Sequence, residues 1–141
     1  MTGCFDILHI GHIKLFRFAK KHVDIVVVGI DSDESVKINK GIGRPVFGQK
    51  IRMEQISALE DVDFVFGVEE TFKFGKKVSN DYYRIVWRII KPSHIITCVL
   101  TDKFWRQKKA LAEELKLNFV GQKENKWASS SEIIKKLKLS E

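Results

Sequence analysis

Cysteine, proline and long apolar runs are scarce in this sequence of 141 residues. The two cysteines, Cys4 and Cys98, are too few for a disulfide scaffold or a zinc site, which favours a reducing, cytoplasmic location. Two prolines and nine glycines exclude a collagen-like or linker-like chain. No apolar run approaches the roughly 20 residues of a membrane span, and the polar start does not resemble a signal peptide. We therefore expect a cytoplasmic protein that does not engage a membrane.

The sequence contains enough hydrophobic residues to form one core. Hydrophobic residues make up 44% of the chain and charged residues 30%, and the length suits a single domain over residues 1–141. The net charge of +7 is uneven, because residues 71–141 carry sixteen Lys and Arg against seven Asp and Glu. This excess indicates an anionic partner: nucleic acid, an acidic surface or a phosphorylated small molecule.

Short apolar runs alternate with helical stripes along the chain. Strands are expected at 24–30, 62–66, 94–99 and 118–120, and helices near 11–21, 49–59, 79–90, 103–116 and 130–139. This alternation predicts an α/β fold with a doubly wound parallel sheet of about five strands. Only Met1 and Thr2 precede Gly3, so the first strand is either short or truncated, and we slightly favour a native start upstream of Met1.

The strongest motif is Gly3-Cys-Phe-Asp-Ile-Leu-His-Ile-Gly-His12. His9 and His12 flank Gly11 where a helix is expected to begin, and a helix N-terminus offers free amides to an anion. Gly11 would let a phosphate approach the backbone, and both histidines can donate hydrogen bonds to its oxygens. This suits the charge that develops on a departing pyrophosphate. The alternatives are incidental polar residues at a helix start and a zinc site, although no Cys or carboxylate stands at ligand spacing.

A second motif lies at Ala128-Ser-Ser-Ser-Glu132. Ser129 and Glu132 form a capping box, which by itself explains a serine there. The hydroxyls and free amides of Ser129, Ser130 and Ser131 are also suited to hold terminal phosphates. Capping and phosphate binding do not exclude each other.

A third segment, Lys40-Gly-Ile-Gly-Arg-Pro-Val46, is rich in glycine and precedes Arg52. A lysine in such a loop can swing onto phosphates, although a solvated loop is the commoner explanation of the segment alone. Asp6 follows a strand-like run and is expected to help anchor Mg²⁺ or ribose, whereas Asp33 stays open because turn aspartates are common. Trp127 is as suited to stacking on a base as to the core.

Together, and in this order, these segments resemble the cytidylyltransferase-like nucleotidyltransferase superfamily, an HxGH family. Residues 3–12 are similar to its G-[TC]-F-D-x-x-H-x-G-H signature. Residues 40–66 are similar to its K-G-x-x-R-P-V…R…L…V-D-x-V segment, and residues 128–137 to its closing S-[ST]-[ST]-x-I-I motif. The resemblance covers about residues 3–68 and 94–137.

The resemblance implies a Rossmann-like sheet and an enzyme that transfers NMP from ATP or CTP to a phosphate monoester, with Mg²⁺ as cofactor and pyrophosphate released. A homodimer is expected, and no metal ligand is assigned. The implied catalytic residues are His9, His12 and Lys40. The implied nucleotide-binding residues are Gly3, Cys4, Phe5, Asp6, Gly11, Asp102, Ser129, Ser130 and Ser131, and the implied substrate contacts are Arg52 and Trp127.

The acceptor is less sharply indicated. Residues 40–46 most resemble the adenylyltransferase half of bacterial ADP-heptose synthase, which favours a sugar or polyol phosphate. The N-terminal motif is similar to glycerol-3-phosphate cytidylyltransferase and to phosphoethanolamine enzymes, and Asp102 resembles a residue of archaeal FAD synthase. Glu60 and Glu124 stand where the glycerol enzyme has arginine, which argues against glycerol 3-phosphate.

The excess of positive charge leaves a different class open, a non-catalytic module that binds nucleotide or nucleic acid. Such a module would carry an RRM, helix-turn-helix or OB pattern, and the sequence shows none of these. We therefore expect an NTP and a phosphorylated small molecule as partners, and no nucleic acid.

Overall fold

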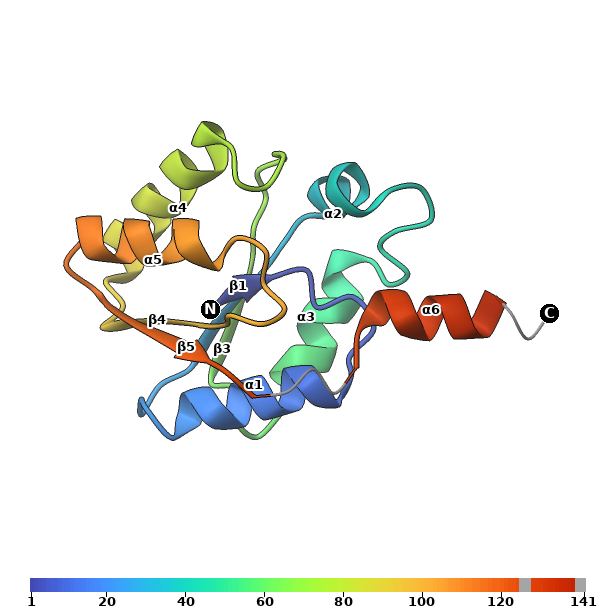
Figure 1. The fold of residues 1–141 in the computed structure, drawn as a ribbon, viewed down its shortest axis with the longest axis horizontal. Coiled ribbons are helices and arrows are strands. Elements are labelled where there is room, and N and C mark those ends of the chain that lie inside the picture. The colour runs from blue at the N-terminus through green and yellow to red at the C-terminus, as the bar shows by residue number, and fades with distance from the viewer. Residues whose placement is uncertain (125–127, 139–141) are drawn as a thin grey trace.

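Short parallel strands alternate with helices in the computed structural model, which describes residues 1–124 and 128–138 (Figure 1). The strands are β1 (Thr2–Gly3), β2 (Val27–Ile30), β3 (Phe64–Gly67), β4 (His94–Cys98) and β5 (Asn118–Gln122). The helices are α1 (Ile10–Lys20), α2 (Asp33–Lys40), α3 (Gln49–Ser57), α4 (Lys77–Ile90), α5 (Trp105–Glu114) and α6 (Ser130–Lys138). The predicted α/β fold with parallel strands is confirmed.

The strands form two groups, β1-β2-β3 and β4-β5, with every pairing parallel. This differs from the single five-stranded sheet that the sequence predicts. The reason is the length of β1, whose two residues offer few backbone groups for a ladder on its second edge. The short first strand is one of the two expected alternatives.

One core nevertheless joins the two strand groups. Val28 and Ile30 of β2 and Ile96 of β4 belong to the same buried cluster, together with Phe16 of α1. The neighbouring Ile95 belongs instead to a second cluster with Trp87 of α4 and Leu111 and Ala112 of α5. Successive strand residues point to opposite faces, so helices cover both faces, as in a doubly wound fold.

Helix α2 is an element that the sequence pattern did not predict. Ser32 caps its start by accepting a hydrogen bond from the Ser35 amide at 3.2 Å, and Gly41 ends it with a φ of 96° that favours glycine. Lys40 therefore lies on the last turn of a helix rather than in a glycine-rich loop.

Among the described residues, no helix has both the length and the apolar character that crossing a membrane requires.

Candidate active site

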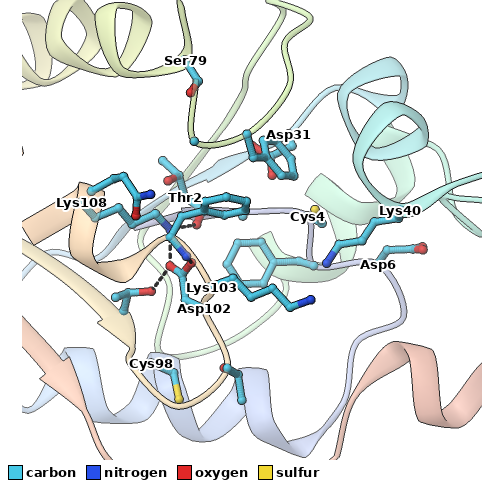
Figure 2. Close-up of a pocket in the computed structure, with 18 of the residues that line it drawn as sticks. Thr2, Cys4, Asp6, Asp31, Lys40, Ser79, Cys98, Asp102, Lys103 and Lys108 are labelled. Atoms are coloured by element: carbon cyan, nitrogen blue, oxygen red, sulfur yellow. Dashed lines mark hydrogen bonds and ion pairs between the residues drawn. The ribbon is translucent and has the colours of Figure 1, made fainter. Parts of the chain in front are cut away.

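A cavity of about 300 Å³ opens beside the carboxyl ends of β1, β2 and β4 (Figure 2). This is where ligands bind in open α/β sheets. Of the residues predicted from the sequence, those that line it are Gly3, Cys4, Phe5, Asp6, His12, Lys40, Asp102, Ser129, Ser130 and Ser131. His9 and Gly11 are not among the lining residues, although the His9 ring stacks on His12, and Trp127 falls outside the described residues.

The two histidines of the motif lie against each other at the start of α1. His9 is the N-cap, and its Nδ1 accepts a hydrogen bond from the Gly11 amide at 3.2 Å, so a neutral ring carries its proton on Nε2. The rings of His9 and His12 are stacked with centroids 3.8 Å apart, and the His12 Nδ1 is buried without a hydrogen-bond partner among the described residues. A Cβ on Gly11 would meet the His9 ring at 3.0 Å, so the glycine makes room for this imidazole.

Both histidines are neutral near pH 7. Burial, followed by the charge of His9, lowers the pKa of His12 to about 3, and burial also lowers the pKa of His9. Neutral imidazoles donate N–H groups to an anion without carrying a proton that titrates in the physiological range. The pair is therefore suited to hold phosphate oxygens by hydrogen bonding.

The buried His12 predicts a pH-dependent stability. Its pKa is about 3 in the fold and about 6.5 in an unfolded chain, so the unfolded state binds more protons between these values. The free energy of unfolding should therefore rise with pH across this window, with His12 contributing up to about 1.4 kcal/mol per pH unit, and fall as the pH drops below 6.5.

Urea unfolding between pH 4.5 and 7.5 measures this slope. His12→Gln should flatten it, the exposed His22→Gln should not, and equal slopes for wild type and His12→Gln would contradict the assignment.

The serine motif lies beside the histidine loop. Ser129 caps α6, because its Oγ accepts a hydrogen bond from the Glu132 amide at 3.2 Å. Ser130 Oγ donates to the backbone carbonyl of Asp6, and Ser131 lies exposed at the cavity rim. The N-terminus of α6 lies near that of α1, as Figure 1 shows, and His12, Ser130 and Ser131 from these two ends line the cavity. Each end brings the positive pole of a helix dipole.

Asp6 organises the loop that follows Lys40. Its buried carboxylate accepts hydrogen bonds from Arg44 Nε at 2.5 Å and from the amides of Val46 and Phe47 at 2.9 and 3.2 Å. These partners use the oxygens that the sequence pattern assigned to ribose or Mg²⁺. In the structure Asp6 therefore fixes the loop, while Lys40 points into the cavity (Figure 2).

Arg52 is buried and does not line the cavity. Its guanidinium donates to the carbonyls of Phe47, Cys4 and Asp31 at 2.5–2.9 Å, and to the Asp33 carboxylate at 2.7 Å. These bonds join the histidine loop, the end of β2 and the start of α3. The substrate contact predicted for Arg52 would have to compete with all of them.

Asp102 lies at the cavity in a hydrogen-bonded cluster. Its Oδ2 accepts from Thr97 Oγ1 and from Lys108 Nζ, both at 2.7 Å, and its Oδ1 accepts from the Phe104 amide at 2.8 Å. Burial alone would raise the pKa of this carboxyl, but the charge of Lys108 and these hydrogen bonds together lower it. Asp102 is therefore ionised near pH 7.

Among the cavity residues that sequence reasoning missed are Asp31, Tyr83 and Lys108. Tyr83 Oη donates to Asp31 Oδ1 at 3.0 Å, and Lys108 Nζ also donates to the Thr2 carbonyl at 3.1 Å. Asp31 directly follows an apolar strand run, so the rule that ligands bind at strand ends would have found it. No local signal marks Tyr83 or Lys108.

Two other kinds of chemistry would need a reactive cysteine or a metal site at the cavity. Burial raises the pKa of the Cys4 thiol, with the nearby Asp31 carboxylate adding to the effect, so this cysteine is not an activated nucleophile. Within residues 1–124 and 128–138, no cluster of three His, Cys, Asp or Glu side chains is placed to hold a metal ion.

A sequence model of the cytidylyltransferase-like family matches residues 1–136, and the chain belongs to this family. The family predicted from the motifs is thereby confirmed.

Particular relatives match smaller parts of the sequence. The bifunctional protein HldE of Campylobacter fetus subsp. fetus is 54% identical over 69 residues, which is 49% of this chain and 15% of that protein. HldE of Desulfatibacillum aliphaticivorans is 51% identical over 64 residues, which is 45% of this chain and 13% of that protein. The matched part thus spans about a seventh of these curated relatives. The lipopolysaccharide core biosynthesis protein of Thermoplasma volcanium GSS1 has a similar structure, with a TM-score of 0.68 and 27% identity over 89% of this chain and 94% of that one.

Proposed function

We propose that this protein transfers the NMP group of ATP or CTP to the phosphate of a small sugar or polyol phosphate and releases pyrophosphate. The observation that carries the proposal is that the N-terminal residues of α1 and α6, the neutral His12 with His9 stacked on it, and Lys40 come together at one cavity. All of these groups attract phosphate oxygens, and they come from distant parts of the sequence.

The transfer needs no covalent intermediate on the protein. An oxygen of the acceptor phosphate attacks the α-phosphorus of the NTP in line, a new P–O bond forms, and the bond to the β-phosphate oxygen breaks. Negative charge then grows on the departing pyrophosphate. The imidazole N–H groups of His9 and His12, the positive ends of the α1 and α6 helix dipoles and the Lys40 ammonium are suited to stabilise that charge. Catalysis on this proposal is positioning combined with electrostatic stabilisation.

Mg²⁺ fits this reaction as part of the nucleotide substrate. The cavity carboxylates Asp6 and Asp102 already accept hydrogen bonds from cationic side chains and backbone amides. Mg²⁺ commonly keeps several waters and is held largely by substrate phosphates. We therefore propose that the ion enters bound to the NTP and supplies charge neutralisation on its phosphates.

A sugar-containing acceptor is supported from two directions. The segment at residues 40–46 resembles the adenylyltransferase half of ADP-heptose synthase, and the similar solved structure is a lipopolysaccharide core biosynthesis protein. The cavity also has apolar walls from α4 and α5, and these suit the carbon frame of a small acceptor.

Pyrophosphate release with Mg²⁺ tests the proposal. ATP and CTP are supplied separately, each with a panel of sugar 1-phosphates, glycerol 3-phosphate, phosphoethanolamine and FMN. We expect turnover with one nucleotide and a sugar or polyol phosphate, and no pyrophosphate release when the acceptor is left out. Nucleotide binding without turnover on any acceptor would favour a non-catalytic nucleotide-binding module instead.

A further inference from the structure

One carboxylate of the cavity has no part in holding phosphates. We propose that Asp31 selects the acceptor, by accepting hydrogen bonds from hydroxyl groups on its sugar or polyol part. This inference rests on the function proposed above and assigns a residue to the choice of acceptor. Asp31 follows the carboxyl end of β2, is only 3% exposed, and lines the cavity together with Tyr83 and with Cys4, which Figure 2 shows near it.

Asp31 differs from the other two carboxylates that line the cavity. Asp6 is paired with Arg44 at 2.5 Å and Asp102 with Lys108 at 2.7 Å. Within the described part of the chain, no Lys or Arg comes within ion-pair distance of the Asp31 carboxylate, and its side-chain donors are the neutral hydroxyl of Tyr83 and thiol of Cys4. Among the described residues it is therefore the cavity carboxylate without a direct ion pair, and Lys108 and Arg52 act on it only through their more distant charges.

The Asp31 carboxylate also keeps room for further hydrogen bonds. An ionised carboxylate has about four lone-pair sites, and the Tyr83 hydroxyl and the Cys4 thiol use two of them. The thiol is a weak donor. Hydroxyl groups of a bound acceptor can therefore be accommodated at this carboxylate without displacing Tyr83.

Keeping this carboxylate has an energetic cost to the fold. Burial raises the pKa of Asp31, because a carboxylate away from water loses its hydration, and the charges of Lys108 and Arg52 offset that loss only in part. If its task were only to hold the Tyr83 hydroxyl, a neutral amide or hydroxyl would serve without that cost. A buried, weakly compensated carboxylate that faces a cavity is the kind of group found at binding sites.

The surroundings favour a hydroxylated acceptor over a cationic one. Lys40, Lys103 and Lys108 line the same cavity, and Figure 2 shows Lys40 and Lys103 extending into it. Lys108 is paired with Asp102, so it is the charges of Lys40 and Lys103 that attract a phosphate and repel an ammonium group such as that of phosphoethanolamine. Tyr83, Trp87 and Leu111 add apolar walls, which suit the C–H faces of a sugar ring or polyol chain.

The test compares acceptors that differ by one hydroxyl, using wild-type protein and Asp31→Asn. The probes are the sugar 1-phosphates and glycerol 3-phosphate of the panel, each with its single-deoxy analogues. For wild type, removing the contacted hydroxyl should lower kcat/KM for the acceptor by about 10²-fold, because a buried acceptor group would lose its partner. Asp31→Asn should raise the KM for the full acceptor by about 10-fold or more, leave the KM for NTP within about 2-fold, and reduce the discrimination against the deoxy analogue.

Asp24→Asn is the matched control, because Asp24 is an exposed carboxylate at the start of the same strand region and does not line the cavity. It should leave all of these constants unchanged. A merely structural role for Asp31 would change stability, or both KM values together, without changing the response to the missing hydroxyl.

The outcomes separate the two proposals. If wild type turns over sugar or polyol phosphates but tolerates every deoxy analogue within about 3-fold, this inference is overturned even if Asp31→Asn does not fold. Equal discrimination by wild type and Asp31→Asn, or turnover confined to phosphoethanolamine, which has no hydroxyl group on its carbon chain, would also overturn it and leave nucleotidyl transfer standing. Absence of turnover with every nucleotide and acceptor would contradict the proposed function, and this inference with it.

Discussion

Replacing His12 with alanine is expected to lower kcat by about 10²-fold or more while nucleotide affinity changes little. The His12 ring stacks on His9 at the cavity and has a Nδ1 without a protein partner among the described residues. If the pair acts mainly on the charge of the departing pyrophosphate, its loss costs transition-state stabilisation rather than ground-state binding. Steady-state pyrophosphate release gives kcat, and calorimetric titration with nucleotide gives the affinity.

The exposed His22 provides the control for this substitution. His22→Ala changes a surface histidine just beyond the C-terminus of α1, at the opposite end of that helix from His12, and should leave both measurements unchanged. A loss of nucleotide affinity as large as the loss of kcat would show that His12 binds substrate and transition state equally, which removes its proposed catalytic role.

Replacing Arg52 with alanine is expected to destabilise the fold by about 3 kcal/mol or more, which corresponds to a drop in Tm of roughly 10 °C for a domain of this size. The buried guanidinium donates to three backbone carbonyls and to Asp33. Alanine would leave those carbonyls without partners and open a cavity between the histidine loop and α3. Urea unfolding and thermal melts measure the loss.

Arg17→Ala is the comparison, because the Arg17 side chain is 64% exposed and lies 3.7 Å from Asp61. Exposed ion pairs of this kind contribute little, so a change below about 1 kcal/mol is expected. If Arg52→Ala kept full stability and instead raised the KM for the acceptor, the substrate contact predicted from the sequence would be the better description of Arg52.

Features set by neighbouring residues could be predicted from the sequence. The histidine motif and the serine motif both lie where a helix begins, and the S-x-x-E spacing correctly marked Ser129 as the cap of α6. The strand run near 24–30 was recognised because β-branched residues gather there, although β2 itself covers only Val27–Ile30. Helix α2 was missed because its eight residues include Val36, Ile38 and Asn39, which have modest helix propensity.

Features set by contacts between distant residues could not be predicted. Tyr83 reaches Asp31 across 52 positions of sequence, and Lys108 reaches Thr2 across 106. The same limit applies to Arg52 and Asp6. When only the neighbouring sequence is known, a charged side chain in such a motif predicts ligand binding. In the fold their charges are used by protein groups that only the tertiary structure brings close. The catalytic and binding roles assigned to the cavity residues stay predictions until activity is measured.

Asp6 belongs to the histidine motif and links it to two other parts of the site. Its carboxylate fixes the loop of Arg44, Val46 and Phe47, and its backbone carbonyl accepts the hydrogen bond of Ser130. A shift of Asp6 would therefore displace both the loop after Lys40 and Ser130, which couples the predicted phosphate-binding motifs to one another. The bonds of Asp6 do not reach the walls contributed by α4 and α5, so on the proposed function these walls can be changed to suit another acceptor while the predicted phosphate contacts stay in place.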